Sequence, residues 1–317
     1  MVTAQKVSET AAIRDGELDG DDAASTLRRV GKKELLKESV ERYRAGDGTS
    51  SARALGYQLA LTTIPLAIAA VGLASAINAE TLSKAVEQTI LSLAPGQGSD
   101  VLKDALESSA QSSGAGGLIA LFFGLVTGLF SLTVAMSQIE RGANRIYGMQ
   151  DDRPLKERYA RGAVLGLIAG LPALLGFLVL VAGRATVEAF GDAYGWDGWA
   201  VTALTWLRWP LGAALCWVAL TVIFERAPRR EQPAKSWLAY GAGLSLVLWL
   251  VFSGLLALYV IASSGFGQLY GPLTGVIALL LWAQLTAIAL FFGLAFAAQL
   301  EFVRSSRRPV SRTSSAG

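Results

Sequence analysis

Six long apolar runs constrain the fold of this chain more than any other feature of its sequence. Each run is near or above the roughly 20 residues that an α-helix needs to cross a bilayer. Because an isolated membrane span must satisfy its own backbone hydrogen bonds, we expect every run to be a helix. The predicted fold class is therefore all-α, a polytopic membrane bundle of six transmembrane helices. The spans are predicted at residues 54–77, 117–139, 163–182, 203–224, 237–262 and 272–299.

The composition argues against a soluble domain and against common enzyme chemistry. Charged residues make up 17% of the 317 residues, whereas a soluble domain usually has about 25%. The chain contains no histidine, which removes the commonest general base and metal ligand. Its single cysteine, Cys216, lies in an apolar run, so no intramolecular disulfide can form. We find no catalytic set, and we predict no enzyme activity, no cofactor and no metal site.

Lysine and arginine are distributed unevenly among the segments that separate the spans. When alternate segments are grouped, with residues 1–25 left out, one group holds 22 of these residues and the other holds four. Cytoplasmic loops carry the excess of basic residues in membrane proteins, so both termini are predicted to be cytoplasmic. The same grouping accounts for the formal net charge of +3 without a nucleic-acid partner. The expected partners of the arginines are anionic lipids at the cytoplasmic face.

The segments outside the spans have their own character. Residues 1–25 are polar and acidic without periodicity, which predicts a disordered tail. Residues 26–45 place apolar residues at helical spacing among basic ones, which predicts an amphipathic helix on the membrane surface. A solvated helix that packs on nothing is the alternative. Residues 46–302 are predicted to form the transmembrane domain, and residues 303–317 a basic disordered tail.

An amphipathic cap is predicted between the first and second spans, at residues 78–116. Leu82, Val86, Ile90 and Leu93 recur at helical spacing and share one face. A second short helix follows, and both are too short and too polar to cross a membrane. We therefore expect them to lie at or above the outer interface.

Glycines and prolines within the spans predict how the helices pack. Gly162, Gly166 and Gly170 recur every four residues in the third span, a pattern that lets two helices approach closely. Pro65 and Pro172 lie inside the first and third spans, where we expect kinks. Helix packing is the favoured interpretation of both features, and a gating hinge is the alternative.

The polar residues that are candidates for function fall into two groups. One group lies in the basic segment between the second and third spans. The other lies in spans or near their ends; ionisable groups at membrane depth are costly and often functional. For the first group, a topology anchor that touches lipid phosphates is the favoured interpretation, and a functional site on the cytoplasmic side is the alternative. The first group is Glu140, Arg141, Asn144, Arg145, Tyr147 and Arg153. The second group is Gln58, Arg184, Glu188 and Gln284.

A series of short motifs in this order resembles the YihY/BrkB family of bacterial inner-membrane proteins. The resemblance covers about residues 35–302, and it rests on order and spacing rather than on any single motif. The motifs are Ala52-Arg-Ala-Leu-Gly-Tyr57, Pro65, Asn144-Arg-Ile-Tyr-Gly148, Arg153-Pro154, Arg226-x-Pro228, Trp237, Gly241, Trp249, Tyr259, Tyr270-Gly271 and Trp282.

Two positions depart from the family pattern. Gln58 follows the first motif where the family usually has an aromatic or small residue. The last span of the family commonly carries Gly-Ala-Glu, whereas here Gly293 is followed by Leu294 and Ala295, and the next carboxylate is Glu301. A mechanism that requires the family carboxylate at that place is therefore in doubt for this chain.

The resemblance implies a multi-pass protein of the bacterial plasma (inner) membrane that supports envelope integrity. We expect it to transport or organise a lipid or a lipid-linked molecule, and it could form a homo-oligomer. The first alternative is a membrane scaffold that binds cytoplasmic partners through its basic loops. A membrane-associated ribonuclease, a label that some family members carry, is the remote alternative, because no clustered carboxylate site is present to hold metal ions. The sequence does not specify a substrate.

Overall fold

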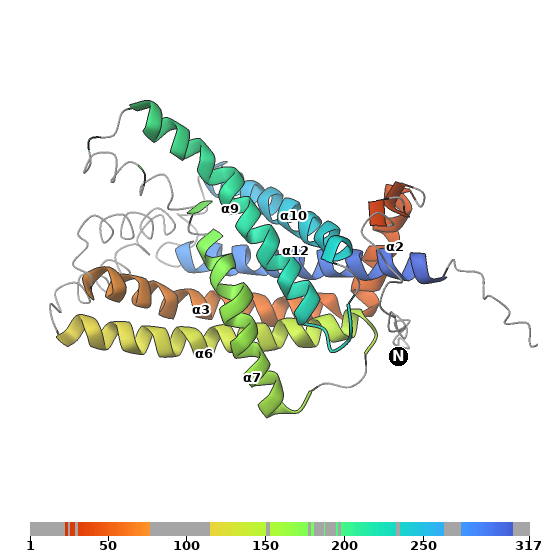
Figure 1. Cartoon of the computed structure of the whole chain (residues 1–317), viewed down its shortest axis with the longest axis horizontal. Helices are drawn as coiled ribbons and strands as arrows, with labels where there is room; N and C mark the ends of the chain where they lie inside the picture. Colours follow the sequence, from red (N-terminus) through yellow and green to blue (C-terminus); the bar gives the residue numbers. More distant parts are fainter. Residues whose placement is uncertain are drawn as a thin grey trace, which may run out of the picture.

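The computed structural model shows a bundle of long helices (Figure 1). Every secondary-structure element in its described part is helical, which confirms the predicted all-α class. The described elements are α2 (Lys32–Ala45), α3 (Gly48–Ala76), α6 (Ala115–Ile146), α7 (Leu155–Leu165), the π-helix η1 (Gly166–Gly170), α9 (Gly198–Arg226), α10 (Lys235–Ala262) and α12 (Thr274–Ser306). The structure describes residues 23–24, 26–28, 31–76, 115–149, 153–176, 179–180, 187, 195, 198–232, 235–262 and 274–306.

Five helical stretches in the described part are long and apolar enough to cross a membrane. They are Phe122–Ile146, Leu155–Gly176, Gly198–Arg226, Trp237–Val260 and Thr274–Val303. They coincide with the second to sixth predicted spans, and the protein is a multi-pass membrane protein.

The first predicted span, 54–77, falls on α3, which has 29 residues with Pro65 inside. Helix α3 is not one of the five stretches. The side chains of residues 66–76 are outside the description, and the described half of α3 carries Gln58 and two threonines. The cap predicted at 78–116 lies almost wholly outside the described residues, because α6 begins at Ala115.

The helices pack as a closed ring of neighbours. Helix α3 packs between α6 and α12, α10 packs between α12 and α9, and α6 contacts α7. The ring closes where α9 contacts η1, the continuation of α7. Figure 1 shows α7 crossing α6 obliquely instead of running beside it.

The buried core is concentrated at one end of the ring. We call this the basic end; it is formed by α2, the last turns of α6, α9 and α12, and the first turns of α3, α7 and α10. Large side chains such as Trp237, Phe224 and Phe291 are almost fully buried there. Away from it the helices are largely exposed, as at Phe123, Phe130 and many other apolar residues of α6, α9 and α10.

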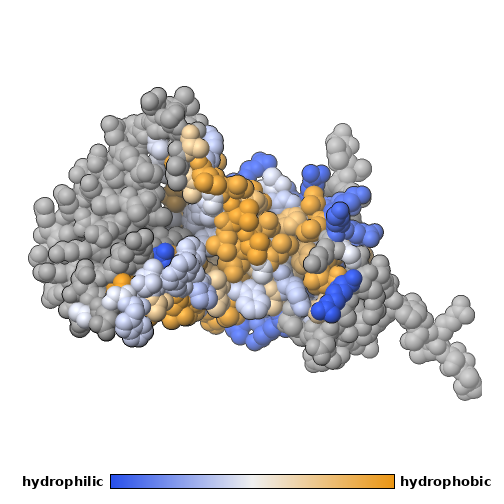
Figure 2. Space-filling model, turned by 90° about the horizontal axis from the view of Figure 1, so that it is seen from above, coloured by the Kyte–Doolittle hydropathy of each residue, from blue (hydrophilic) through white to orange (hydrophobic). Residues whose placement is uncertain are grey.

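The exposed apolar surface is the part of the protein that lipid tails would cover. Figure 2 shows hydrophobic surface over the middle of the molecule and hydrophilic residues toward the end that carries α2. Lipid tails are as apolar as leucine, so such side chains lose nothing by facing them. This distribution agrees with a membrane-embedded bundle whose polar contacts gather at one end.

Glycines mark the closest helix contacts. A Cβ atom at Gly162 would lie 2.8 Å from the carbonyl oxygen of Thr133 in α6, and Gly166 and Gly170 both face Leu132. The packing role predicted for this glycine series is thereby confirmed. A Cβ at Gly293 of α12 would lie 2.5 Å from the carbonyl oxygen of Gly241 in α10, so these two backbones also meet directly.

The third span departs from α-helical geometry close to its proline. Over η1 the turns widen, and the N–H of Leu171 bonds to the carbonyl of Gly166, five residues earlier. Such π-helical turns are short insertions that bend helices. The irregularity lies immediately before Pro172, the residue at which the sequence predicts a kink.

Helix α2 packs against protein on its buried face. It contacts α12, α3 and α6, and Leu35 and Ser39 are fully buried. Helical residues also occur at 23 and 24, within the stretch predicted to be disordered, and Ala23 is buried. The contact of this segment with a membrane surface stays a prediction.

Candidate functional site

Buried polar side chains gather at the basic end and join elements that are far apart in the sequence. We call this group the polar network. Each member is either almost fully buried or bonded directly to a buried member. The polar network consists of Glu38, Arg42, Glu140, Asn144, Tyr147, Arg153, Arg230, Gln299 and Glu301.

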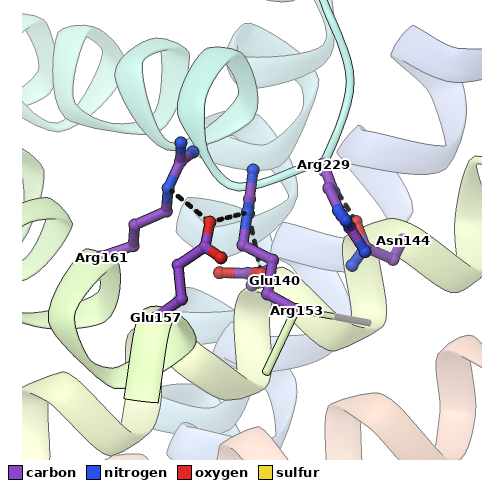
Figure 3. Close-up of polar contacts among 6 residues, drawn as sticks. All are labelled: Glu140, Asn144, Arg153, Glu157, Arg161 and Arg229. Atoms are coloured by element: carbon purple, nitrogen blue, oxygen red, sulfur yellow. Dashed lines mark hydrogen bonds and ion pairs between the residues drawn. The ribbon is translucent and has the colours of Figure 1, made fainter. Parts of the chain in front are cut away.

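The first part of the network is a buried ion pair between α6 and the residues that precede α7. Nη1 of Arg153 lies 2.7 Å from Oε1 of Glu140, and the two side chains are only 7% and 5% exposed. Glu157 also approaches Arg153, at 3.5 Å, and Arg161 at 3.6 Å, but it is half-exposed. Figure 3 shows this chain of charges. Glu140 is therefore the carboxylate that depends most on Arg153.

Local structure fixes the position of Arg153. The following residue, Pro154, is the N-cap of α7, with φ −52° and ψ 147°. Proline restricts the residue before it to extended conformations, so the chain arrives at α7 without helical structure. The carbonyl of Pro154 accepts the N–H of Arg158 at 3.0 Å. This start of α7 directs Arg153 toward α6.

The second part ties α6 to the segment between α9 and α10. Asn144 is buried in the last turn of α6. Its Oδ1 accepts a hydrogen bond from the backbone N–H of Arg229 at 2.9 Å, as Figure 3 shows. The bond is partly buried, and a backbone N–H that loses its partner away from water costs about 1–3 kcal/mol. Asn144 thereby fixes where this segment crosses the bundle.

The third part joins the same segment to α12. Arg230 forms a buried ion pair with Glu301, and its guanidinium carbon lies 4.8 Å from the ring centroid of Tyr147. Burial raises the pKa of Tyr147 well above that of an exposed phenol, and the nearby Glu301 adds to the effect. Tyr147 therefore stays neutral and offers Arg230 an aromatic face.

The fourth part holds α2 on the bundle. Nε of Arg42 donates a hydrogen bond to Oε1 of Gln299 at 2.7 Å, and its Nη1 donates to the carbonyl of Ile146 at 3.1 Å. Nε2 of Gln299 in turn donates to Oε2 of Glu38 at 2.9 Å.

Ile146 is the last residue of α6, where carbonyl groups lack helical partners. Arg42 therefore caps the negative end of α6 with a cation. Burial lowers the pKa of Arg42, while Tyr147 and Glu301 oppose that shift. Arginine has so high an ordinary pKa that the group stays charged.

The structure places the sequence-predicted candidates in different surroundings. Glu140, Asn144, Tyr147 and Arg153 meet in the polar network. Arg145 is exposed, and its Nη1 lies 3.0 Å from Oδ2 of Asp47. Arg141 lies on α6 outside the network and is partly buried.

The candidates within spans do not join this network. Nε2 of Gln58 donates to the carbonyl of Ser131 at 3.2 Å, which links α3 to α6. Gln284 lies where α12 passes Gly56 of α3. Arg184 and Glu188 lie outside the described residues.

Sequence reasoning missed five of the nine members of the network. Glu38, Arg42, Arg230 and Gln299 were not candidates, and Glu301 was noted only as the carboxylate nearest to a family position. Arg230 and Glu301 lie shortly after apolar runs, where a charge looks like an ordinary topology marker, and Arg42 is one of several basic residues in the amphipathic stretch 26–45. The signal that separates them is burial, which depends on the neighbouring helices.

The carboxylates of the polar network are engaged with other side chains. Glu140 and Glu301 are each paired with an arginine, and Glu38 accepts a hydrogen bond from Gln299. Within the described residues, no group of three or more Asp, Glu, His or Cys side chains is arranged to hold a metal ion.

Comparison with known proteins assigns the family. The family described as "Virulence factor BrkB" matches residues 39–316. The chain belongs to the BrkB family. Every residue of the polar network except Glu38 lies within the matched region. The network therefore belongs to the region that characterises BrkB proteins. The description names no reaction.

Two relatives of this BrkB protein extend over most of its length. A ribonuclease-like protein, YfkH, of Bacillus subtilis is 23% identical over 82% of this chain and 92% of its own. A UPF0761 membrane protein of Alteromonas mediterranea is 26% identical over 84% of this chain and 88% of its own. No solved structure shows a significant match. The ribonuclease-like label belongs to a distant relative, whereas the other relative is named only as a membrane protein.

Proposed function

We propose that this protein transports or organises a lipid or lipid-linked molecule in the bacterial plasma membrane and thereby supports the cell envelope. The observation that carries the proposal is the polar network, which closes one end of an otherwise apolar ring of helices. Its contacts run between separate elements: α6 to the start of α7, α6 and α12 to the α9–α10 segment, and α12 to α2.

Stability alone is a weak reason to retain such contacts. Removing an ion from water costs several kcal/mol even in a relaxed protein, and apolar replacements of buried pairs are often equally stable. Ionisable groups at the edge of the membrane are therefore functional candidates. Ion pairs between separate elements suit an interface that opens and closes, since each released charge can be solvated by water when the elements part.

The two surfaces of the bundle fit an amphipathic substrate. A lipid has a polar headgroup and apolar tails. Its headgroup would be compatible with the polar network, while its tails would stay against the exposed apolar side chains of α6, α9 and α10. A water-soluble substrate would make no use of that outer surface.

Lipid movement can be tested in vesicles that contain the purified protein. We expect fluorescent phospholipids to cross these vesicles faster than protein-free vesicles of the same composition. Arg230→Gln should change this rate, because it removes the ion pair between the α9–α10 segment and α12. Arg145→Gln, which affects an exposed pair, should leave it unchanged. Rates equal to those of empty vesicles for all headgroups tried would count against transport.

The orientation is also a proposal, supported by the distribution of basic residues. With both termini in the cytoplasm, the basic end faces the cytoplasm. Reporter fusions after Gly96 and after Asp152 should then lie on opposite sides of the membrane, with Gly96 outside. Reporters on the same side would overturn the six-span topology.

A further inference from the structure

Among the described residues, two arginines beside the polar network have no acidic partner. Arg141 is on α6 and Arg158 is in the first turns of α7. Arg158 is only 7% exposed. Within the described residues, the Nε atoms of both arginines are buried and without a hydrogen-bond partner. Buried charges are normally paired, and no described carboxylate pairs with the buried Arg158.

The crossing of α6 and α7 brings these two residues to the same place. Gly162 of α7 lies against α6, where its Cβ would be 2.8 Å from the carbonyl of Thr133 and 3.6 Å from the nitrogen of Ser137. Arg158 is one helical turn before Gly162, on the same buried face of α7. Arg141 is one turn after Ser137 along α6. The two side chains therefore come from adjoining turns at one helix crossing.

The nearby carboxylates that the structure describes are already engaged. Glu140 pairs with Arg153 at 2.7 Å, and Glu157 lies between Arg153 and Arg161 at 3.5 and 3.6 Å. The one described partner of Arg158 is the ring of Tyr159, with 5.9 Å from the guanidinium carbon to the centroid. An aromatic ring carries no net charge, so none of the described residues compensates the positive charge of the pair.

We propose that Arg141 and Arg158 form a phosphate-binding site at the crossing of α6 and α7. Guanidinium groups bind phosphate through two parallel hydrogen bonds, and these charge-assisted bonds are among the strongest in proteins. Arg158 is held by its buried stem, and the partly buried Arg141 leaves the pair open to a ligand. The phosphate can belong to a lipid headgroup or be free in solution.

The depth of the site favours contact with headgroups. Arg141 lies near the end of the span Phe122–Ile146, and Arg158 near the start of the span Leu155–Gly176. Both positions are within a few residues of the water boundary, where lipid phosphates lie. The inference concerns binding, and it holds whether or not the protein moves lipid.

Binding can be measured by native mass spectrometry of the purified full-length chain in a neutral detergent. The probes are phosphatidylglycerol and diglucosyl diacylglycerol with the same acyl chains, so that they differ in the phosphate. We expect retention of phosphatidylglycerol but not of the glycolipid. In Arg141→Gln/Arg158→Gln, the apparent Kd for phosphatidylglycerol should rise at least about tenfold, since a hydrogen bond to a charged group contributes about 1.5–3 kcal/mol.

The matched control is Arg145→Gln/Arg161→Gln, which removes the same charge from the same two helices. Arg145 and Arg161 are half-exposed and paired with Asp47 and Glu157, so this variant should bind phosphatidylglycerol as the parent does. Arg158→Lys keeps the charge and the fold but loses the planar fork, and it should bind with intermediate affinity. Because Arg158→Lys keeps the positive charge at this position, weaker binding by this variant reports the loss of the guanidinium group and not the loss of folding.

A third arm identifies the source of the phosphate. Millimolar inorganic phosphate should not displace phosphatidylglycerol if the headgroup is the ligand. If inorganic phosphate displaces phosphatidylglycerol from the parent protein but not from Arg141→Gln/Arg158→Gln, the ligand is free phosphate. That result would still support a phosphate site at these two arginines. Equal binding of phosphatidylglycerol by the two double variants would overturn the proposal, as would equal retention of the glycolipid by the parent protein.

Discussion

Replacing Arg153 by glutamine should lower the free energy of unfolding by about 3–5 kcal/mol, the usual effect of removing one partner of a buried ion pair. The reason is the isolation of Glu140. Its side chain is 5% exposed, and Arg153 is its partner at 2.7 Å. Glutamine cannot supply a positive charge, so the carboxylate stays buried without compensation. Denaturant titration in mixed micelles would measure the change.

Three further variants make this prediction specific. Glu140→Gln should destabilise less than Arg153→Gln, because Arg153 keeps Glu157 at 3.5 Å. The double variant should regain part of the loss, since it leaves no unpaired charge. Arg145→Gln breaks a half-exposed pair and should cost less than about 1 kcal/mol. Equal effects of Arg153→Gln and Arg145→Gln would contradict the buried pair.

Replacing Arg230 by glutamine should be equally severe, at about 3–5 kcal/mol. It leaves Glu301, which is almost fully buried in the last turns of α12, without its cation. It also removes the guanidinium group that lies 4.8 Å from the Tyr147 ring. We expect the α9–α10 segment to become more accessible, which limited proteolysis within residues 227–232 would detect along with the loss of stability.

Arg226→Gln is the matched control for this second prediction. Arg226 is the last residue of α9 and is exposed, so its loss should change stability by no more than about 0.5 kcal/mol. Arg230→Gln combined with Glu301→Gln should recover part of the stability, because both buried charges are then gone. A double variant as unstable as the sum of its two single variants would show that the pair is not coupled.

Only part of the candidate functional site could be predicted from the sequence. The basic segment after α6 was identified from its arginines, and four of its candidates, Glu140, Asn144, Tyr147 and Arg153, do meet at the basic end. The sequence treated Arg145 as equal to Arg153, although one is half-exposed and the other is buried. Both residues are arginines in a polar stretch, so nothing local separates them.

The partners of these residues could not be predicted from the sequence, because they lie far away in the chain. Arg42 and Gln299 are 257 residues apart in the chain and bond at 2.7 Å, and Arg230 and Glu301 are 71 residues apart. Whether two such side chains meet depends on how α12 is rotated and on where it crosses α2 and α10. Hydropathy and periodicity report on one helix at a time and contain no such information.

The sequence by itself determined that the chain is a multi-pass helical membrane protein, because apolar length and backbone hydrogen bonding leave no other stable solution in lipid. It also predicted from Gly162, Gly166 and Gly170 that the third span packs closely against another helix, since small residues are what such contacts require, and the structure identifies that helix as α6. Only the tertiary structure decided which charges at the basic end are buried and paired. That outcome depends on the relative rotation of helices that are far apart in the chain, and packing fixes the rotation only once the whole ring has formed.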